Sequence, residues 1–215
     1  MKIKWLGHAA FLIIAEDGTK IITDPYAVGG GIAYGKIKES ADIVTVSHDH
    51  GDHNNSAAIG GNPQVLNSVV NTRVKNVAIR SFASFHDSAQ GTQKGKNIIF
   101  CLNVDGMNLC HLGDLGHTLD SKTIADIGQV DILLIPVGGF FTIDATTATG
   151  VSNALKAKVI IPMHYLTSKV SYPIAGVDNF IRGKSGVKKV NSSEIEIKKD
   201  SLPASAVIIV LQHAL

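Results

Sequence analysis

Apolar and β-branched residues recur along the chain in short runs separated by polar or glycine-rich segments. At the N-terminus, residues 3–15 and 20–25 form two such runs on either side of Asp17-Gly18, a pair typical of a tight hairpin turn. We therefore expect the chain to open with antiparallel sheet. Further strand-like runs occupy residues 41–48, 76–86, 97–104, 107–114, 130–139, 157–165 and 204–211.

Helical patterns are weaker and fall between these runs. Candidate helices cover residues 54–60, 120–129, 144–156 and 175–183, and the third resembles a helix opened by an Asp/Thr cap. No internal repeat, linker or low-complexity segment interrupts the order. The 215 residues are ample for one hydrophobic core, so residues 1–215 are expected to form a single domain.

Composition narrows the class of protein. Hydrophobic residues make up 45% of the chain and the formal net charge is only +2, which is too mild to indicate nucleic-acid binding by charge alone. No apolar run approaches the roughly 18 residues that cross a bilayer, and the N-terminus lacks a convincing signal peptide. The two cysteines, Cys101 and Cys110, are too few for a disulfide scaffold and fit small core residues in a cytoplasmic protein.

Ligand-type side chains gather at the ends of the strand-like runs. In "VSHDHGDHN", residues 46–54, His48 and His50 lie two apart in an extended segment and can face one ion. Past Gly51, Asp52 and His53 can turn toward a second position, and other strand-like runs end at or near His86, Asp114 and His164. Neutral imidazole and carboxylate suit Zn, Mn or Fe, so the pattern indicates a two-metal hydrolytic site.

Two other interpretations of this cluster are weaker. A solvated polar loop with hydrogen-bonded histidines would explain any single histidine, but not four ligand-type residues within six positions. A structural zinc site would usually contain more cysteine.

The sequence resembles the metallo-β-lactamase superfamily. "HDHGDH" matches its His-x-His-x-Asp-His signature, and "HLGD" and "PMHY" match its later ligand segments in order. "WLGHAAFLI", "TDP" and "PVGG" resemble the branch of metal-dependent hydrolases related to ascorbate-phosphate lactonase. This resemblance implies an α+β fold, a four-layer αββα sandwich of two mixed sheets flanked by helices, with the metals at one edge.

The resemblance also implies a role for each candidate residue. His48, His50 and His86 would hold the first metal, Asp52, His53 and His164 the second, and Asp114 would bridge them. His8, Asp24 and His111 would lie near the metals without binding them. The choice between His86 and His111 as the third ligand of the first metal stays open. Tyr165 is either close to the site or a buried aromatic with a satisfied hydroxyl.

These residues predict a hydrolase with two divalent ions, zinc first and Mn or Fe as alternatives. A metal-bound hydroxide would attack an electrophilic carbon or phosphorus, with Asp52 orienting or deprotonating the water. By resemblance alone, the substrate would be a small phosphorylated molecule, either a phosphodiester or a sugar-phosphate lactone. Nucleic acid and homo-oligomer formation stay open, and no membrane partner is expected. The main alternative function is a non-catalytic metal-bound ligand-sensing module. Redox chemistry at a di-iron centre is a third, weaker alternative.

Overall fold

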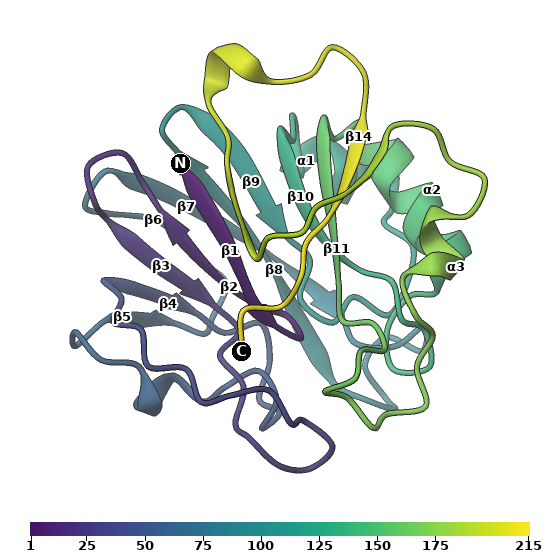
Figure 1. Cartoon of the computed structure of the whole chain (residues 1–215), viewed down its shortest axis with the longest axis horizontal. Coiled ribbons are helices and arrows are strands. Elements are labelled where there is room, and N and C mark those ends of the chain that lie inside the picture. The colour runs from purple at the N-terminus through teal and green to yellow at the C-terminus, as the bar shows by residue number, and fades with distance from the viewer.

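The computed structural model describes all residues 1–215, and two β-sheets packed face to face form its body (Figure 1). The first sheet has six strands in the order β13-β1-β2-β3-β4-β5. Its antiparallel part opens the chain, and β3, β4 and β5 continue it in parallel. The strands are β1 (Lys2–Gly7), β2 (Ala10–Ile14), β3 (Lys20–Thr23), β4 (Ile43–Thr45), β5 (Gln64–Leu66) and β13 (Glu194–Glu196).

The second sheet has eight strands in the order β12-β14-β11-β10-β9-β8-β7-β6. Strands β6 to β9 are antiparallel, whereas β9, β10, β11, β14 and β12 run parallel to one another. The strands are β6 (Asn71–Val74), β7 (Val77–Phe85), β8 (Lys96–Val104), β9 (Met107–His111), β10 (Ile132–Pro136), β11 (Val159–Met163), β12 (Val187–Lys189) and β14 (Val207–Val210).

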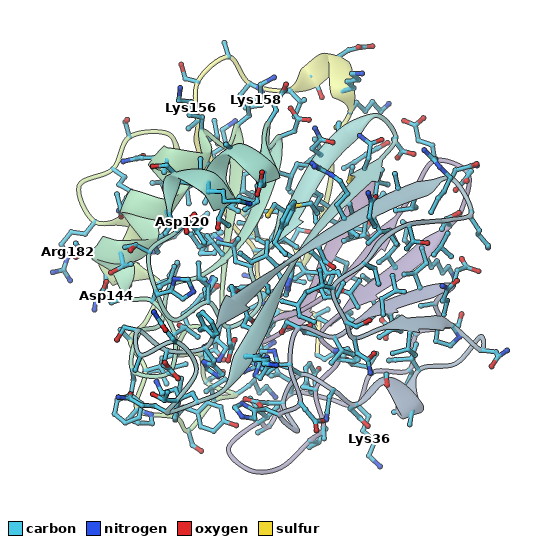
Figure 2. The ribbon with its side chains drawn as sticks, turned by 180° about the vertical axis from the view of Figure 1, so that it is seen from behind. Lys36, Asp120, Asp144, Lys156, Lys158 and Arg182 are labelled. Atoms are coloured by element: carbon cyan, nitrogen blue, oxygen red, sulfur yellow. The ribbon has the colours of Figure 1, made fainter.

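Three α-helices lie on the side of the eight-stranded sheet that faces away from the first sheet (Figure 1). Asp120 and Asp144 cap the first two, accepting hydrogen bonds from the backbone N–H groups of Thr123 and Thr147, and both carboxylates lie on this side (Figure 2). The helices are α1 (Ser121–Ile127), α2 (Ala145–Leu155) and α3 (Asp178–Ile181). None of the helices is long and apolar enough to cross a membrane.

Alternation along the first sheet explains its packing. Ile3, Trp5 and Ile13 point into the core between the sheets, whereas Leu12 and Ile22 point to the outer face. That outer face is covered by side chains of the segment 25–41, including Tyr26, Ile32, Tyr34 and Ile37. The α+β sandwich of two mixed sheets is therefore confirmed, with a loop layer over the first sheet. The helix predicted over residues 54–60 is only a 3₁₀ turn, Ser56–Ala58.

Strands β8 and β9 form a hairpin. Asp105 and Gly106 both have positive φ, 52° and 71°, as a tight hairpin turn requires. Cys101 and Cys110 therefore face each other across the two strands, with their Sγ atoms 3.4 Å apart, buried and not joined in a disulfide.

The strands bring the ligand-type residues to one edge, at the lower side of Figure 1. Strands β1, β3 and β4 run in one direction in the first sheet, and β7, β9 and β11 do so in the second. Each is followed within three residues by a candidate site residue, in chain order His8, Asp24, His48, His86, Asp114 and His164. Loops at one rim of a rigid sheet are a common place for functional sites.

Candidate metal centre

Asp114 lies at the centre of a ring of histidines. Its Oδ2 atom is 3.2 Å from the Nε2 atoms of His53 and His86, 3.3 Å from that of His164 and 3.8 Å from that of His48. All five side chains are buried. The structure thus brings together histidines from three connections, those that follow β4, β7 and β11, around a carboxylate from a fourth.

Two groups of ligand atoms meet at this carboxylate. His48, His50 and His86 form one, and His8, Asp52, His53 and His164 form the other, with the ligand atoms of each group within 4.8 Å of one another. These groups match the residues that the resemblance assigns to a first and a second metal, with His8 added to the second. The assignment of each residue as a ligand stays a prediction.

A hydrogen-bond network behind the centre orients two of the imidazoles. The Ser47 hydroxyl donates to Oδ2 of Asp24 at 2.6 Å, so it accepts from Nδ1–H of His48 at 2.9 Å. Asp24 also accepts from Nδ1–H of His53 at 2.9 Å. With the protons on Nδ1, the Nε2 lone pairs of both histidines face Asp114, and this tautomer is assigned from the network.

These orientations fit a bound cation. The buried Nε2 atoms of His48 and His53 and the buried Oδ1 atom of Asp114 have no hydrogen-bond partner. Lone pairs that face a carboxylate without an intervening positive charge would be strongly unfavourable in a buried site. Nitrogen and oxygen donors of this kind suit first-row divalent ions.

The electrostatics of the cluster point the same way. Burial, followed by the charge of His53, lowers the pKa of His48 to about 3, so its imidazole is neutral near pH 7. Burial would raise the pKa of Asp114, but His164 and His53 lower it well below its usual value. For His53, burial is outweighed by Asp114 and Asp24, which raise its pKa well above 6.5. The carboxylates therefore favour a positive charge beside Nε2 of His53, supplied by a proton on that nitrogen or by a metal ion in its place.

Asp52 lies at the front of the second group. Its Oδ2 atom is 3.2 Å from Nε2 of His8 and accepts from the Tyr172 hydroxyl at 3.4 Å. Burial would raise the pKa of Asp52, but the hydrogen bond with His8 and the charge of His53 lower it overall. Asp52 is thus an ionised carboxylate, with a side chain that is 20% exposed and open to the cavity above the centre.

Three of the site residues have strained backbones. His8, Asp24 and His164 adopt φ values of 53°, 39° and 50°, which non-glycine residues rarely adopt. The backbone N–H of His164 donates to the carbonyl of His8 at 3.2 Å, and the Trp5 indole donates to the same oxygen at 2.9 Å. The first and second sheets are thus linked directly at this edge.

His111 and Tyr165 were expected near the metals, but their polar atoms point away from Asp114 and contact backbone groups. His111 contacts the carbonyl of Ala9 through Nε2 at 2.9 Å and accepts from the N–H of Gly113 at 3.1 Å, so neither ring nitrogen faces Asp114. The hydroxyl of Tyr165 points toward the carbonyl of Leu211 at 3.5 Å, and its ring lies 5.1 Å from Trp5. Of the two interpretations of Tyr165, the structure shows the buried aromatic.

Sequence reasoning missed several residues that shape the site. Ser47 directly precedes His48, but a serine at that position has no distinctive pattern. Asn97 begins a strand-like run, and its Oδ1 atom accepts from the backbone N–H of Asp114 at 2.9 Å. Lys94 and Tyr172 line the cavity of about 340 Å³ above the centre, and both come from loops without a recognisable motif.

Comparisons with known proteins agree with this geometry. A domain family described as the beta-lactamase superfamily domain matches residues 2–164. A metal-dependent hydrolase (UPF0173) of Carboxydothermus hydrogenoformans is 35% identical in an alignment 205 positions long that covers 83% of this chain and 88% of that protein. A relative from Pelotomaculum thermopropionicum is 32% identical in an alignment 226 positions long that covers 92% of this chain and 96% of that protein.

A solved structure extends the likeness to the whole fold. A Thermotoga maritima protein, described as a Zn-dependent hydrolase of the metallo-beta-lactamase superfamily, superposes with a TM-score of 0.83 at 36% identity. The match covers 98% of this chain and 97% of that one. Similarity to metal-dependent hydrolases of one fold therefore spans nearly the entire sequence.

Proposed function

Because the chain belongs to the metallo-β-lactamase superfamily and is a metal-dependent hydrolase, we propose that its centre holds two divalent ions and cleaves a phosphodiester or a sugar-phosphate lactone. The observation that carries the dinuclear proposal is the position of Asp114. One carboxylate has ring nitrogens of both ligand groups within 3.2–3.8 Å of a single oxygen. A shared carboxylate between two ligand groups is what a two-metal hydrolytic site needs.

In this proposal each residue has a defined task. His48, His50 and His86 would hold one ion, Asp52, His53 and His164 would hold the other, and Asp114 would contribute to both. When bound, the ions, zinc first and Mn or Fe as alternatives, would lower the pKa of a water molecule and stabilise negative charge on the substrate. Asp52 would accept a proton from the attacking water, and His8 and Tyr172 hold its carboxylate in place.

The proposed substrate class rests on resemblance to the lactonase-related branch. The proposed compartment and domain organisation rest on the cysteines and on the strand order. We place the reaction in the cytoplasm, supported by two free cysteines and no disulfide. We treat residues 1–215 as one functional domain, because β13 and β14, near the C-terminus, complete the first and second sheets. A ligand-sensing module with the same metals is the rival function, and the ionised, partly exposed Asp52 favours catalysis over it.

Metal titration combined with the Asp52→Asn variant tests the proposal. The purified protein should bind two ions per chain, and saturation at one ion with full activity would contradict the dinuclear centre. Wild-type protein is screened against phosphodiesters, sugar-phosphate lactones and thioesters. Asp52→Asn should then lower turnover of the best substrate by about 10²–10⁴-fold at matched metal content, because a carboxylate base is lost.

The exposed Asp200 provides a matched control outside the site. Asp200→Asn removes the same charge and should leave turnover unchanged. Equal rates for Asp52→Asn and wild type would assign the activity to contamination. No activity on any class, together with tight reversible binding of a phosphorylated ligand, would favour the sensing module.

A further inference from the structure

We propose that Lys94 binds an anionic group of the substrate, a phosphate or a carboxylate, between the cavity above the metal centre and a second, larger cavity beside it. This inference rests on the proposed function and specifies which substrates the same centre accepts. It makes Lys94 a specificity-determining residue.

The two cavities meet at Lys94. The cavity of about 340 Å³ is lined by metal-centre residues together with Gln93, Phe141 and Tyr172. The second cavity, of about 720 Å³, lies between the β4 end, the β5–β6 connection and the β7–β8 hairpin. Only His50 and Lys94 line both cavities. A molecule that reaches from one into the other must therefore pass these two side chains.

The Lys94 ammonium is held in place but keeps binding capacity. Its Nζ atom donates to the carbonyls of Phe140 at 2.7 Å and Phe141 at 3.0 Å, and it lies 5.5 Å from the centre of the Phe141 ring. An ammonium has three N–H donors, so one is left. The protein's salt bridges involve other lysines, and none joins Lys94 to a carboxylate. The half-buried positive charge thus faces the cavities without an acidic partner.

The loop that carries Lys94 is rigidly built. The Asp87 carboxylate accepts four backbone N–H groups, from Ala89 and Gly91 on Oδ1 and from Gln93 and Lys94 on Oδ2. Asp87 directly follows His86, so the loop is fixed to a metal-centre residue. Lys94 is therefore positioned before any substrate arrives.

The larger cavity indicates what the remainder of the substrate is. Its lining beyond the proposed metal ligands combines two charged side chains of opposite sign, Asp49 and Lys96, with neutral polar and apolar groups, among them Asn67, Ser68, Ser84, Val69, Phe85 and Ile98. Because these two charges have opposite sign, such a surface suits an organic part that has a few hydroxyl groups and no net charge. The structure therefore fits a substrate with its scissile bond at the centre, its anionic group at Lys94 and a neutral part in the larger cavity.

Calorimetric binding of phenylphosphonate and of benzoate, at equal metal content, tests this inference. Lys94→Gln removes the charge but keeps an N–H donor. It should lower the binding affinity for one or both anions by about 10- to 100-fold, because a hydrogen bond to a charged group is lost. The larger loss of affinity identifies the group that Lys94 binds: phosphate if phenylphosphonate is affected more, carboxylate if benzoate is. Lys94→Arg should retain most of the affinity because the charge remains.

Lys36→Gln is the matched control, because Lys36 is exposed and projects outward from the segment 25–41 (Figure 2). It should leave both affinities unchanged. If Lys94→Gln lowers the melting temperature but leaves the affinity for both anions unchanged, Lys94 only stabilises the loop through its hydrogen bonds to Phe140 and Phe141. This result would overturn the inference. Equal weakening in Lys94→Arg and Lys94→Gln would overturn it too, since charge would not be the cause. Metal stoichiometry and turnover are measured separately, so failure here differs from failure of the hydrolase proposal.

Discussion

Asp114 and His86 show how single residues decide the character of the centre. His86 follows the long strand β7 and places its Nε2 atom 3.2 Å from Asp114. His111 ends β9, only three residues before Asp114, yet both its ring nitrogens contact backbone groups. Proximity to Asp114 in sequence is therefore a poor guide to the direction in which a ring nitrogen points.

Replacing these two histidines should have opposite effects on metal content. His86→Ala removes a proposed ligand and should lose the first-site ion, measured by elemental analysis after gel filtration. His111→Ala should retain both ions, with at most the 10–100-fold loss of affinity typical of groups behind the ligands. Retention of both ions in His86→Ala, with loss in His111→Ala, would reverse the assignment.

The sequence identifies the dense part of the centre better than its outlying parts. In "HDHGDH" the ligand types lie so close together that local geometry alone brings them near one site. His86 and Tyr172 reach the cavity only through tertiary packing, which no spacing along the chain reveals. The strained backbones of His8, Asp24 and His164 are likewise invisible in the sequence, because the rest of the fold imposes them.

At the scale of elements, Gly138 shows where two loops between strands approach each other closely. Gly138, in "PVGG" after β10, packs against the connection that follows β11. A Cβ atom there would lie 2.3 Å from the carbonyl oxygen of His164 and 3.2 Å from Ile174. A side chain at this position would therefore push the two loops apart at a proposed ligand.

We expect Gly138→Ala to lower both stability and second-site affinity. Overpacking typically costs about 1–3 kcal/mol, and each kcal/mol lowers the melting temperature of a chain this size by about 2–4 °C. Gly150→Ala is the control, because a Cβ atom there meets nothing within 4 Å inside α2 and should stabilise the helix by about 0.5–1 kcal/mol. Thermal melts and metal titration of both variants check this, and unchanged behaviour of Gly138→Ala would show that the loops relax freely.

Elements with strong patterns were predictable, whereas short edge strands were not. The strands β7, β8, β10 and β11 lie in long apolar runs of the sequence. All residues of β10 and β11 are buried, whereas β7 and β8 also contain half-buried and exposed residues. Strands β5, β6, β12 and β13 have three or four residues, and most of these are exposed or half-buried. Their existence depends on a neighbouring strand that offers hydrogen bonds, so their own residues carry little signal.

At the scale of the whole molecule, the centre couples folding to pH. His8 and His48 are buried, and their pKa values are lowered to about 3, chiefly by that burial. In the unfolded chain the same imidazoles titrate near 6.5. As the pH falls below 6.5, the unfolded state gains protons that the folded state cannot accept, so the free energy of unfolding falls. The lowered pKa values of Asp24, Asp52 and Asp114 extend this loss to still lower pH.

His53 acts in the opposite direction but cannot cancel the effect. Its raised folded-state pKa stabilises the protein fully below pH 6.5 and loses that contribution only as the pH rises. Between pH 6.5 and pH 5 its contribution is nearly complete already, whereas His8 and His48 each lose on the order of 1–2 kcal/mol. The net change on acidification is therefore destabilising.

We therefore expect the chelator-treated protein to melt several degrees lower at pH 5 than at pH 7, as measured by calorimetry. The His48→Gln variant removes one of the two titrating groups and should reduce the difference between the two melting temperatures. Added zinc should raise the melting temperature more at pH 7 than at pH 5, because the ligands must be deprotonated to bind. A melting temperature equal or higher at pH 5 in the chelated protein would mean that its buried imidazoles accept protons in the folded state, and that the centre is open to water when no metal is bound.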